Sequence, residues 1–474
     1  MSSAPTFSVE AVELFERPVK LRMPFRFGVV TLTAAPQAFV RARIRLDDGR
    51  QAQGMAAELM APKWFDKNPG LNNDDNFEQL RNALRIARGL YTDGGIDSAF
   101  GHFVRHYQAQ IGRAAQQGLN SLVANYGPAL IDRAVLDALC RALQLPFHEV
   151  IRRNLAGIQV TPLTPDLRGF DLDAFLAGLR PAEAIAARHT VGLVDPITAS
   201  DAHDAVNDGL PETLEEVVST YGHRWFKLKV AGNVDADVAR LLRIASVLDR
   251  IDGGYRSTLD GNEQYDSIDG ALQLWQRMRA EPGLRRLCDS VIFIEQPIKR
   301  AAALAQDVGA LSSQKPVILD ESDDSLDAFV QGKARGYLGV SSKTCKGLYK
   351  SILNRARCAK WNAEAGTERY IMSAEDLTIQ AGLALQQDLA LVSLLGITHS
   401  ERNGHHYGRG LRDAPEAERA AFVQAHADLY DRDARLRIDG GVIALDSLHA
   451  PGYAHGADPD PQAMQPLDAA PGLL

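Results

Sequence analysis

Charged side chains recur at the ends of short apolar runs in the second half of the chain. Each follows a stretch that is typical of a buried β-strand, and from Lys229 onward the intervals are 31, 35, 25 and 23 residues, each compatible with one βα unit. They are Lys227 and Lys229 in KLKV, Asp260 in LDGN, Glu295 in IEQP, Asp320 and Glu321 in LDES, and Lys343 in SSKT. Because the carboxyl ends of parallel barrel strands meet at one rim, we expect these side chains to converge.

The acids of this set predict a metal site. Carboxylates that are buried together need a counter-charge, because like charges oppose one another's ionisation. A hard cation supplies that charge, and three carboxylate ligands with positions left for water or substrate suit Mg²⁺. A single acid or lysine at a strand end is usually a helix cap or a solvated loop charge, so the inference depends on the set as a whole.

The lysines indicate proton transfer beside that metal. Removing a proton next to a carboxylate creates a dianionic enolate, which a divalent ion stabilises electrostatically. A lysine acts as the base when its pKa falls toward the working pH, and a metal ion or a second lysine lowers it. Lys227 and Lys229 share one face of their strand, and Lys343 comes from a strand across the barrel.

The front of the chain predicts a separate α+β unit over residues 1–155. Residues 7–15 and 38–47 have the composition of strands, and the second ends at the turn signal Asp48-Gly49. Helical periodicity follows over residues 76–117 and again over 128–153.

From about residue 156 to 410 the rhythm changes to strands that alternate with helices. The strand candidates are HTVGLV, RWFKLKV, RSTLDGN, SVIFIEQP, PVILDES, YLGVSSK, RYIMSAED and GITHS. Eight such units favour a parallel (β/α)₈-type barrel, with a doubly wound open sheet as the alternative. No GxGxxG motif follows the first strand, which argues against a dinucleotide-binding version. Residues 158–187 form an apparent insertion, and a long C-terminal stretch follows residue 410.

Composition limits the classes of partner and compartment. The 52 Lys and Arg residues against 60 Asp and Glu give a formal net charge of −8, which argues against nucleic acid as a partner. No run of 18 apolar residues or signal-peptide pattern occurs, so we expect no membrane association and a cytoplasmic protein. The four cysteines are scattered without metal-ligand spacing, as expected of reduced thiols.

As a set, these motifs resemble the enolase superfamily, specifically its muconate-lactonizing-enzyme-like branch (the mandelate racemase/muconate lactonizing enzyme family). The resemblance implies an α+β capping domain over a (β/α)₇β TIM-like barrel, with residues from about 411 to 474 returning to the cap. It implies Lys229 and Lys343 as acid/base residues, assisted by Lys227. It also implies Asp260, Glu295 and Asp320 as ligands of Mg²⁺, with Mn²⁺ as a substitute, and a homo-oligomeric state.

Further candidates surround this set. The resemblance makes Glu321 and Asn262 supports of the metal site, and the arginine forks of Arg22 and Arg26 could hold a distal anionic group of the substrate or be surface charges. His399, His405 and His406 follow the last strand candidate as loop residues or as substrate contacts. Glu375 and Asp376 line the cleft or, slightly favoured, cap the next helix.

The chain departs from the family pattern in places. The usual tryptophan-glycine-glutamate run after the second cap strand is GMAAELM here, and TCKGL follows the lysine of the sixth strand. RYIMSAEDL lacks the histidine of the mandelate-racemase-like branch. The transfer of a specific substrate is therefore unsafe, and the roles of the 158–187 insertion and the 401–408 loop stay open.

The leading functional hypothesis is Mg²⁺-dependent abstraction of an α-proton from a small-molecule carboxylate substrate. Racemisation or epimerisation, cycloisomerisation and elimination of the dehydratase type all start from the same enolate. Two alternatives stay open: a Schiff-base lyase with Lys343 as nucleophile, and a non-catalytic descendant that binds a metabolite. The sequence names neither the substrate nor the reaction outcome.

Overall fold

The computed structural model describes residues 4–27, 30–202 and 205–469 and consists of an antiparallel cap and a parallel barrel. The cap sheet has the strand order β14-β1-β2-β3, with a short β4 beside β1. Its strands are β1 (Phe7–Phe27), β2 (Val30–Leu46), β3 (Gln51–Leu59), β4 (Ile96–Asp97) and β14 (Gln465–Pro466). The predicted strand 7–15 lies within the longer β1, the predicted strand 38–47 coincides with the second half of β2 and runs one residue beyond it, and Asp48-Gly49 lies in the turn between β2 and β3.

Three helices cover one face of the cap sheet: α1 (Asn73–Thr92), α2 (Ala99–Gln116) and α3 (Ser121–Leu143). The predicted helical stretch 76–117 is split where Gly94 and Gly95 end the first helix. The stretch 128–153 begins earlier, at Ser121, and ends at Leu143 before a short α4 (Phe147–Arg152). Gly54 of β3 permits the close packing of sheet on helix, because a Cβ there would lie 2.2 Å from the Ala138 amide nitrogen of α3.

The barrel closes from eight parallel strands, since β5 pairs with β6 on one side and with β12 on the other. The strands are β5 (Ala184–Val191), β6 (Trp225–Lys229), β7 (Arg256–Asp260), β8 (Val291–Glu295), β9 (Val317–Leu319), β10 (Gly339–Ser342), β11 (Ile371–Ala374) and β12 (His399–Glu401). A ninth strand, β13 (Val442–Ala444), pairs antiparallel with the first three residues of β5, Ala184 to Ala186.

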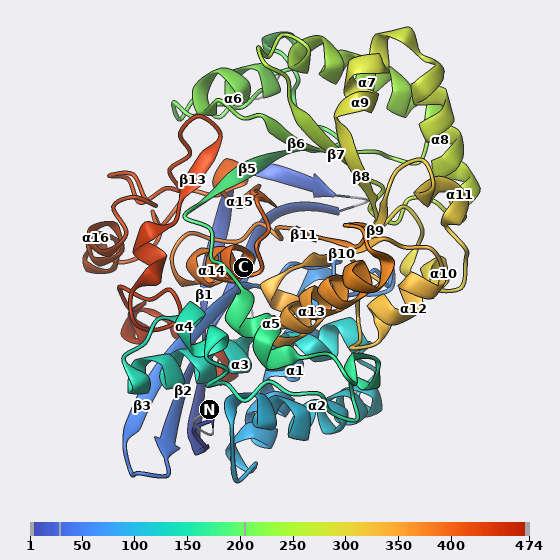
Figure 1. Cartoon of the computed structure of the whole chain (residues 1–474). Helices are drawn as coiled ribbons and strands as arrows, with labels where there is room; N and C mark the ends of the chain where they lie inside the picture. The colour runs from blue at the N-terminus through green and yellow to red at the C-terminus, as the bar shows by residue number, and fades with distance from the viewer. Residues whose placement is uncertain (1–3, 28–29, 203–204, 470–474) are drawn as a thin grey trace.

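Helices on the outside connect successive barrel strands (Figure 1). They are α6 (Leu214–Tyr221), α7 (Val234–Leu248), α8 (Ile268–Ala280), α9 (Arg285–Ser290), α10 (Arg300–Ala303), α11 (Gly309–Ser312), α12 (Ala328–Ala334), α13 (Leu348–Ala365) and α14 (Leu383–Leu394). The last strand is followed by α15 (Gly404–Tyr407) and α16 (Glu416–Ala425). This arrangement confirms the predicted fold class and excludes the open sheet. None of the described helices is long and apolar enough to span a bilayer.

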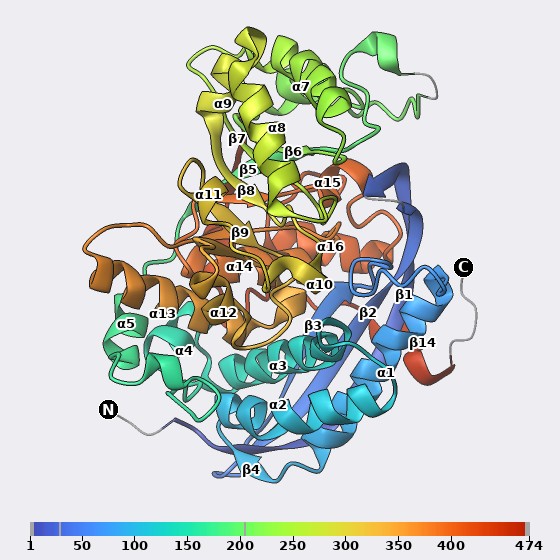
Figure 2. The same cartoon turned by 90° about the vertical axis from the view of Figure 1, so that its right-hand side faces the viewer.

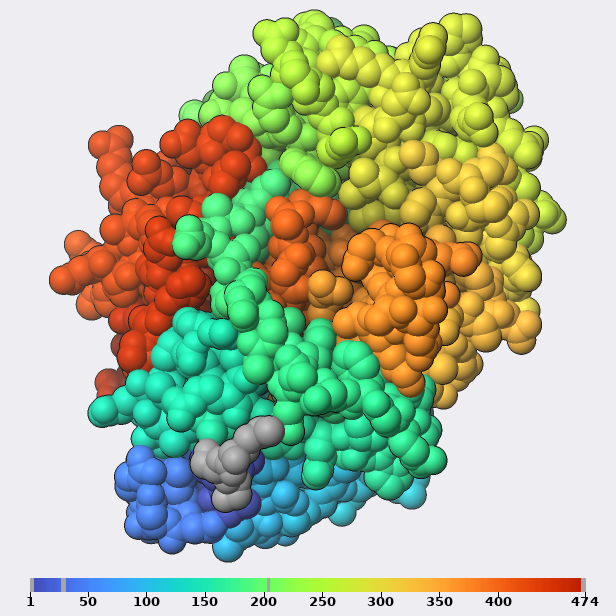
Figure 3. All heavy atoms as spheres, in the orientation of Figure 1, coloured from blue at the N-terminus to red at the C-terminus, as the bar shows by residue number. Residues whose placement is uncertain are grey.

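The segment between cap and barrel crosses the surface from one to the other (Figure 3). It contains a 3₁₀ turn at Pro165–Leu167 and the helix α5 (Leu172–Gly178), and β5 begins within the range predicted as an insertion. Asp166 anchors the segment to α13, since its carboxylate accepts hydrogen bonds of 2.8 and 3.0 Å from the Arg357 guanidinium.

A buried ion pair within the cap also contacts the barrel. Arg133 of α3 lies 3.0 Å from Glu58 of β3, and both side chains are fully buried. The same Glu58 oxygen accepts a hydrogen bond of 3.1 Å from Thr344, directly after Lys343. Burial raises the pKa of Glu58 to about 7, although Arg133 opposes the shift. The cap is thus fixed at the rim where the predicted site residues lie.

Candidate active site at the carboxyl end of the barrel

Successive barrel strands deliver one charged residue each to the same rim. Lys229, Asp260 and Glu295 are the last residues of β6, β7 and β8, and they are aligned across the sheet as direct partners. Asp320, Lys343 and Glu375 come directly after β9, β10 and β11, and Glu401 ends β12. All of them are buried. Together with Lys227 we call these residues the carboxylate–lysine network.

Lys227 lies at the centre of this network. Its ammonium nitrogen is 3.0 Å from Asp260, 2.9 Å from Glu295, 2.8 Å from Glu375 and 3.0 Å from Glu401. Burial alone would lower the pKa of Lys227, but these four carboxylates outweigh it and raise the pKa well above its usual range. The four carboxylates thus favour the charged form of Lys227, which makes it suited to stabilising negative charge.

The other two predicted lysines face each other across the barrel. Lys229 on β6 lies 2.5 Å from Asp260, and Lys343 after β10 forms an ion pair with Asp320. Because β6 and β10 are four strands apart in a closed ring of eight, the two lysines come from opposite walls. The Lys343 ammonium also lies 4.3 Å from the centre of the Trp64 ring, which belongs to the cap. Burial alone would lower the pKa of Lys343, but the charge of Asp320 outweighs it, so the pKa of Lys343 is raised.

Asp320 is held by more donors than the sequence indicated. Beside Lys343, it accepts a hydrogen bond from Ser341 and lies 3.4 Å from the buried ammonium of Lys346. Burial opposes its ionisation, but these lysines outweigh it and bring the pKa of Asp320 well below its usual range. Lys346 also lies 3.0 Å from Asp323. Asp320 is thus ionised, as a metal ligand must be.

Asn262 and Glu321 lie beside the predicted ligands. The Asn262 backbone amide donates a hydrogen bond of 2.7 Å to Asp260, and its side-chain amide donates one of 2.8 Å to Glu321. In the part of the chain that the structure describes, Asn262 Oδ1 and Glu321 Oε2 are buried without a hydrogen-bond partner. Burial and the charge of Asp320 raise the pKa of Glu321 to about 7.

A cavity lies above the network, between barrel and cap. Phe25, Leu32, Ala61 and Trp64 line it from the cap side, and the barrel side consists of Lys227, Lys229, Asn262, Asp320, Lys343, Asp376, Leu377, Thr378, Glu401 and Asn403. Its volume is about 20 Å³, which is room for about one water molecule. A substrate can therefore enter only if side chains of the cap move.

The remaining candidates lie outside this cavity. Arg22 is buried, and its guanidinium binds Asp208 at 2.8 Å and the His406 carbonyl at 2.8 Å, while Arg26 is exposed on β1. His399 is the first residue of β12, so it lies at the amino end of the strand. Its ring stacks on Trp225 at 4.3 Å, and burial lowers its pKa well below the usual range.

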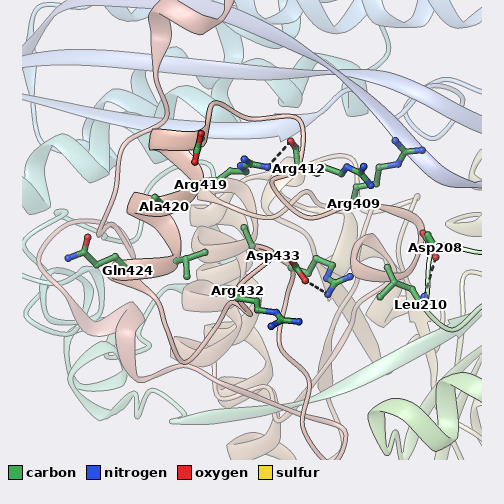
Figure 4. Close-up of a pocket in the computed structure, with 13 residues that line it drawn as sticks. Asp208, Leu210, Arg409, Arg412, Arg419, Ala420, Gln424, Arg432 and Asp433 are labelled. Atoms are coloured by element: carbon green, nitrogen blue, oxygen red, sulfur yellow. Dashed lines mark hydrogen bonds and ion pairs between the residues drawn. The ribbon is translucent and has the colours of Figure 1, made fainter.

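A larger pocket of about 710 Å³ lies elsewhere, beside α16 (Figure 4). Arginines are prominent among the residues that line it: Arg409, Arg412, Arg419, Arg432 and Arg435. None of the strand-end acids or lysines reaches it, so its size does not make it the reaction site.

The comparisons with known proteins agree with this geometry. The family model described as enolase C-terminal domain-like, in its mandelate racemase/muconate lactonizing enzyme form, matches residues 209–452, which is more than half of the chain. The chain belongs to the enolase superfamily. The search of curated protein sequences found no match.

Solved structures of the superfamily resemble the whole chain at low identity. A muconate lactonizing enzyme from Mycobacterium smegmatis, complexed with muconolactone, is 18% identical with a TM-score of 0.61, covering 96% of this chain and 98% of that one. A dipeptide epimerase from Enterococcus faecalis, complexed with Mg and the dipeptide L-Leu-L-Tyr, is 15% identical with a TM-score of 0.57, covering 94% and 99%. An enolase from Bradyrhizobium, complexed with magnesium and mandelic acid, is 15% identical with a TM-score of 0.57, covering 97% of each. At this identity the likeness shows the fold.

The donor atoms of the network are of the type that a hard divalent cation prefers, but among the described residues the three carboxylates do not form a group with all ligand atoms within 4.8 Å of one another. It offers the carboxylates of Asp260, Glu295 and Asp320, and the unpartnered oxygens of Asn262 and Glu321 lie next to Asp260 and Asp320. Oxygen donors of this kind suit Mg²⁺. Lysine ammonium groups contact all three acids in the structure, so a bound cation would take over part of their role as counter-charge.

Sequence reasoning missed several members of the network. Glu375 forms ion pairs with Arg188 of β5 and with Lys227, whereas the sequence slightly favoured a role for it as a helix cap. Glu401 and Arg188 were not singled out. The signal that could have found Arg188 is its position as a charged residue in an apolar strand. Arg188 and Thr190 are two residues apart on β5, so their side chains share the inward face and reach Glu375 and Glu401.

Proposed function

We propose that this chain is a Mg²⁺-dependent enzyme that removes the α-proton of a carboxylate substrate and returns a proton to the resulting enolate. The observation that carries the proposal is the placement of Lys229 and Lys343 on opposite walls of the barrel, with the acids of the three intervening strands between them. This placement suits a substrate carbon held between two lysines. A bound Mg²⁺ would supply charge stabilisation for the enolate.

The chain's own residues divide the remaining work. Lys229 and Lys343 exchange protons with the α-carbon, one from each side. Lys227, held as a cation by four carboxylates, attracts the negative charge of the substrate. Asp260 and Asp320 each hold one of the two outer lysines in place. Asp320 raises the pKa of Lys343, so a cation held by Asp320 would weaken that effect and favour the neutral amine that a base needs.

The cap supplies selectivity and closure in this proposal. Phe25, Leu32 and Trp64 cover the cavity, and apolar side chains exclude water from the reacting groups. Because the closed cavity holds only about 20 Å³, substrate entry requires these side chains to swing away, as lids commonly do. Racemisation or epimerisation, cycloisomerisation and elimination all remain compatible with this arrangement.

The test is a screen for exchange of the α-hydrogen in deuterated solvent. Dipeptides, acid sugars, N-acylamino acids and betaines are incubated with the protein and Mg²⁺, and deuterium uptake is followed by NMR and mass spectrometry. We expect uptake in at least one class, and we expect EDTA to abolish it. Turnover that persists without any divalent metal would overturn the proposal.

A Schiff-base lyase is the alternative enzyme class for Lys343. A Schiff-base mechanism gives no role to the carboxylates of Asp260, Glu295 and Asp320 that surround the lysines. Borohydride reduction in the presence of carbonyl substrates distinguishes the two. Covalent labelling of Lys343 would favour the lyase, and its absence together with Mg²⁺-dependent exchange favours proton abstraction. If no acid is turned over while a metabolite still binds tightly, the non-catalytic alternative gains.

A further inference from the structure

Three histidines meet on the outer side of the barrel wall, away from the carboxylate–lysine network. His189 lies on β5, His223 lies two residues before β6, and His405 lies on α15. One ring nitrogen from each lies within 4.8 Å of the other two. We call these three residues the histidine cluster.

The alternation of side chains along β5 separates the cluster from the network. Arg188 and Thr190 reach Glu375 and Glu401 inside the barrel. His189 stands between them in sequence, and successive side chains of a strand point to opposite faces. His189 therefore points outward, with its ring centre 5.4 Å from that of His223 and 6.3 Å from that of His405.

The proton of one imidazole is fixed by its hydrogen bond. His223 Nδ1 lies 2.9 Å from the Ala187 carbonyl oxygen, and a carbonyl only accepts, so the ring proton must sit on Nδ1. This leaves the lone pair on Nε2, which is buried and has no hydrogen-bond partner among the described residues. A carbonyl contact of this kind orients metal-binding histidines in many proteins.

The other two rings also present buried nitrogens without partners. His189 Nδ1 forms no hydrogen bond within the part of the chain that the structure describes, and the ring of His405 has only a weak interaction with the Arg402 backbone. Buried polar atoms are usually satisfied, so a group of them that faces one point needs an explanation. Burial also lowers the pKa of His223 to about 4 and those of His189 and His405 well below the usual range. At neutral pH the rings are therefore uncharged, the form that binds metals.

We propose that His189, His223 and His405 bind a divalent transition-metal ion of the zinc type. Three imidazoles without a carboxylate select zinc, copper or nickel over magnesium and calcium, which prefer oxygen. Four-coordinate zinc sites commonly take three or four protein ligands. The fourth position is left to water, since His406, whose ring centre lies 4.9 Å from that of His189, is not one of the three residues that form the cluster.

The ion would tie the first barrel strand to the loop that follows the last one. That loop reaches the reaction cavity, because Asn403 lines it and the backbone amides of Asn403 and Gly404 donate to Asp376 at 2.8 and 3.0 Å. Only one residue separates Asn403 from His405. The proposed ion is thus a structural element that holds α15 and, through it, one wall of the cavity. It is independent of the Mg²⁺ site and of the proposed reaction.

The test measures metal binding directly on the full-length protein, produced without a histidine tag and treated with a chelator. Co²⁺ is the probe, because nitrogen-bound tetrahedral Co²⁺ has visible absorption, and the titration is made in excess Mg²⁺ to fill the oxygen site. We expect one equivalent to bind with that absorption and Zn²⁺ to displace it. X-ray absorption of the Zn²⁺ form should then show nitrogen neighbours at about 2.0–2.1 Å.

Variants assign the site. His223→Gln and His405→Gln are expected to weaken Co²⁺ binding by at least about 100-fold, since each removes one of three protein ligands. His449→Gln is the matched control, because His449 faces His148 at 4.8 Å in a separate histidine pair, and it should bind as the wild type does. His405 is only partly buried, so we expect His405→Gln to fold. If His223→Gln does not fold, the result with His405→Gln decides the question. Absence of stoichiometric Co²⁺ binding in the wild type, or unchanged binding in His405→Gln, would overturn the proposal.

Discussion

The pH dependence of the C-terminal segment gives a prediction whose size follows from the structure. His455 lies 3.0 Å from Asp137 of α3, with side chains only 5% and 0% exposed. Burial disfavours the charged ring, but Asp137 and Asp458 outweigh it and raise the pKa of His455 to about 9 from 6.5. The same segment stacks Tyr453 on Phe147 at 3.9 Å. Protonated His455 is therefore an anchor of this segment on the cap.

The sign follows from which state holds the proton more tightly. Because the pKa is raised in the folded chain, the stabilisation is complete below pH 6.5 and is lost as the pH rises through about 9. A shift of about 2.5 units at about 1.4 kcal/mol per unit amounts to about 3 kcal/mol at most. The lowered pKa of Asp137 arises from the same contact with His455, so its free energy is already contained in this figure.

The assay compares wild type with His455→Gln by urea unfolding below pH 6.5 and above pH 9. Glutamine has no charge to lose, so the stability difference between the two proteins should shrink by about 2–3 kcal/mol over this interval. Hydrogen exchange in residues 446–469 should increase in parallel in the wild type. Equal pH dependence in both proteins would refute the reasoning.

Three further predictions concern the cap and the metal. Glu58→Ala should cost about 3–5 kcal/mol by denaturant titration, because it leaves the buried Arg133 without the carboxylate that balances its charge; a loss below about 1 kcal/mol would contradict this. Gly54→Ala should destabilise the cap by about 1–3 kcal/mol, whereas Gly112→Ala, in open space on α2, should be neutral or stabilising. Asp320→Asn should raise the Mg²⁺ concentration needed for activity at least about tenfold, and an unchanged requirement would remove Asp320 from the ligands.

The sequence was most informative where charge interrupts an apolar run. The fold class and the strand-end residues Lys229, Asp260 and Glu295 could be placed because each ends a short strand of a regular βα rhythm. Because the βα units repeat at similar lengths, a charged residue at the end of one strand predicts where the charged residue at the end of the next strand lies. Gly94 and Gly95 were available as a signal for the break between α1 and α2 but were outweighed by the long helical periodicity.

The remainder depends on contacts between distant segments. Glu401 lies in a histidine-rich stretch that resembles a loop, and only its place at the end of β12 shows that it reaches Lys227. Arg22 was a candidate for substrate binding, but Asp208, 186 residues away, binds its guanidinium. Which partner a long side chain chooses depends on tertiary packing, and sequence spacing does not encode it.

The proposed function depends on Lys229 and Lys343 moving protons at one carbon from opposite sides. The most direct measurement is the rate of α-hydrogen exchange with deuterated solvent, for the best substrate of the screen, in wild type, Lys229→Ala, Lys343→Ala and the exposed control Lys299→Ala. We expect the exchange rate to fall by about 10²–10⁴-fold in each of the first two variants and to stay unchanged in the control. Exchange that survives in both Lys229→Ala and Lys343→Ala would contradict the proposed function.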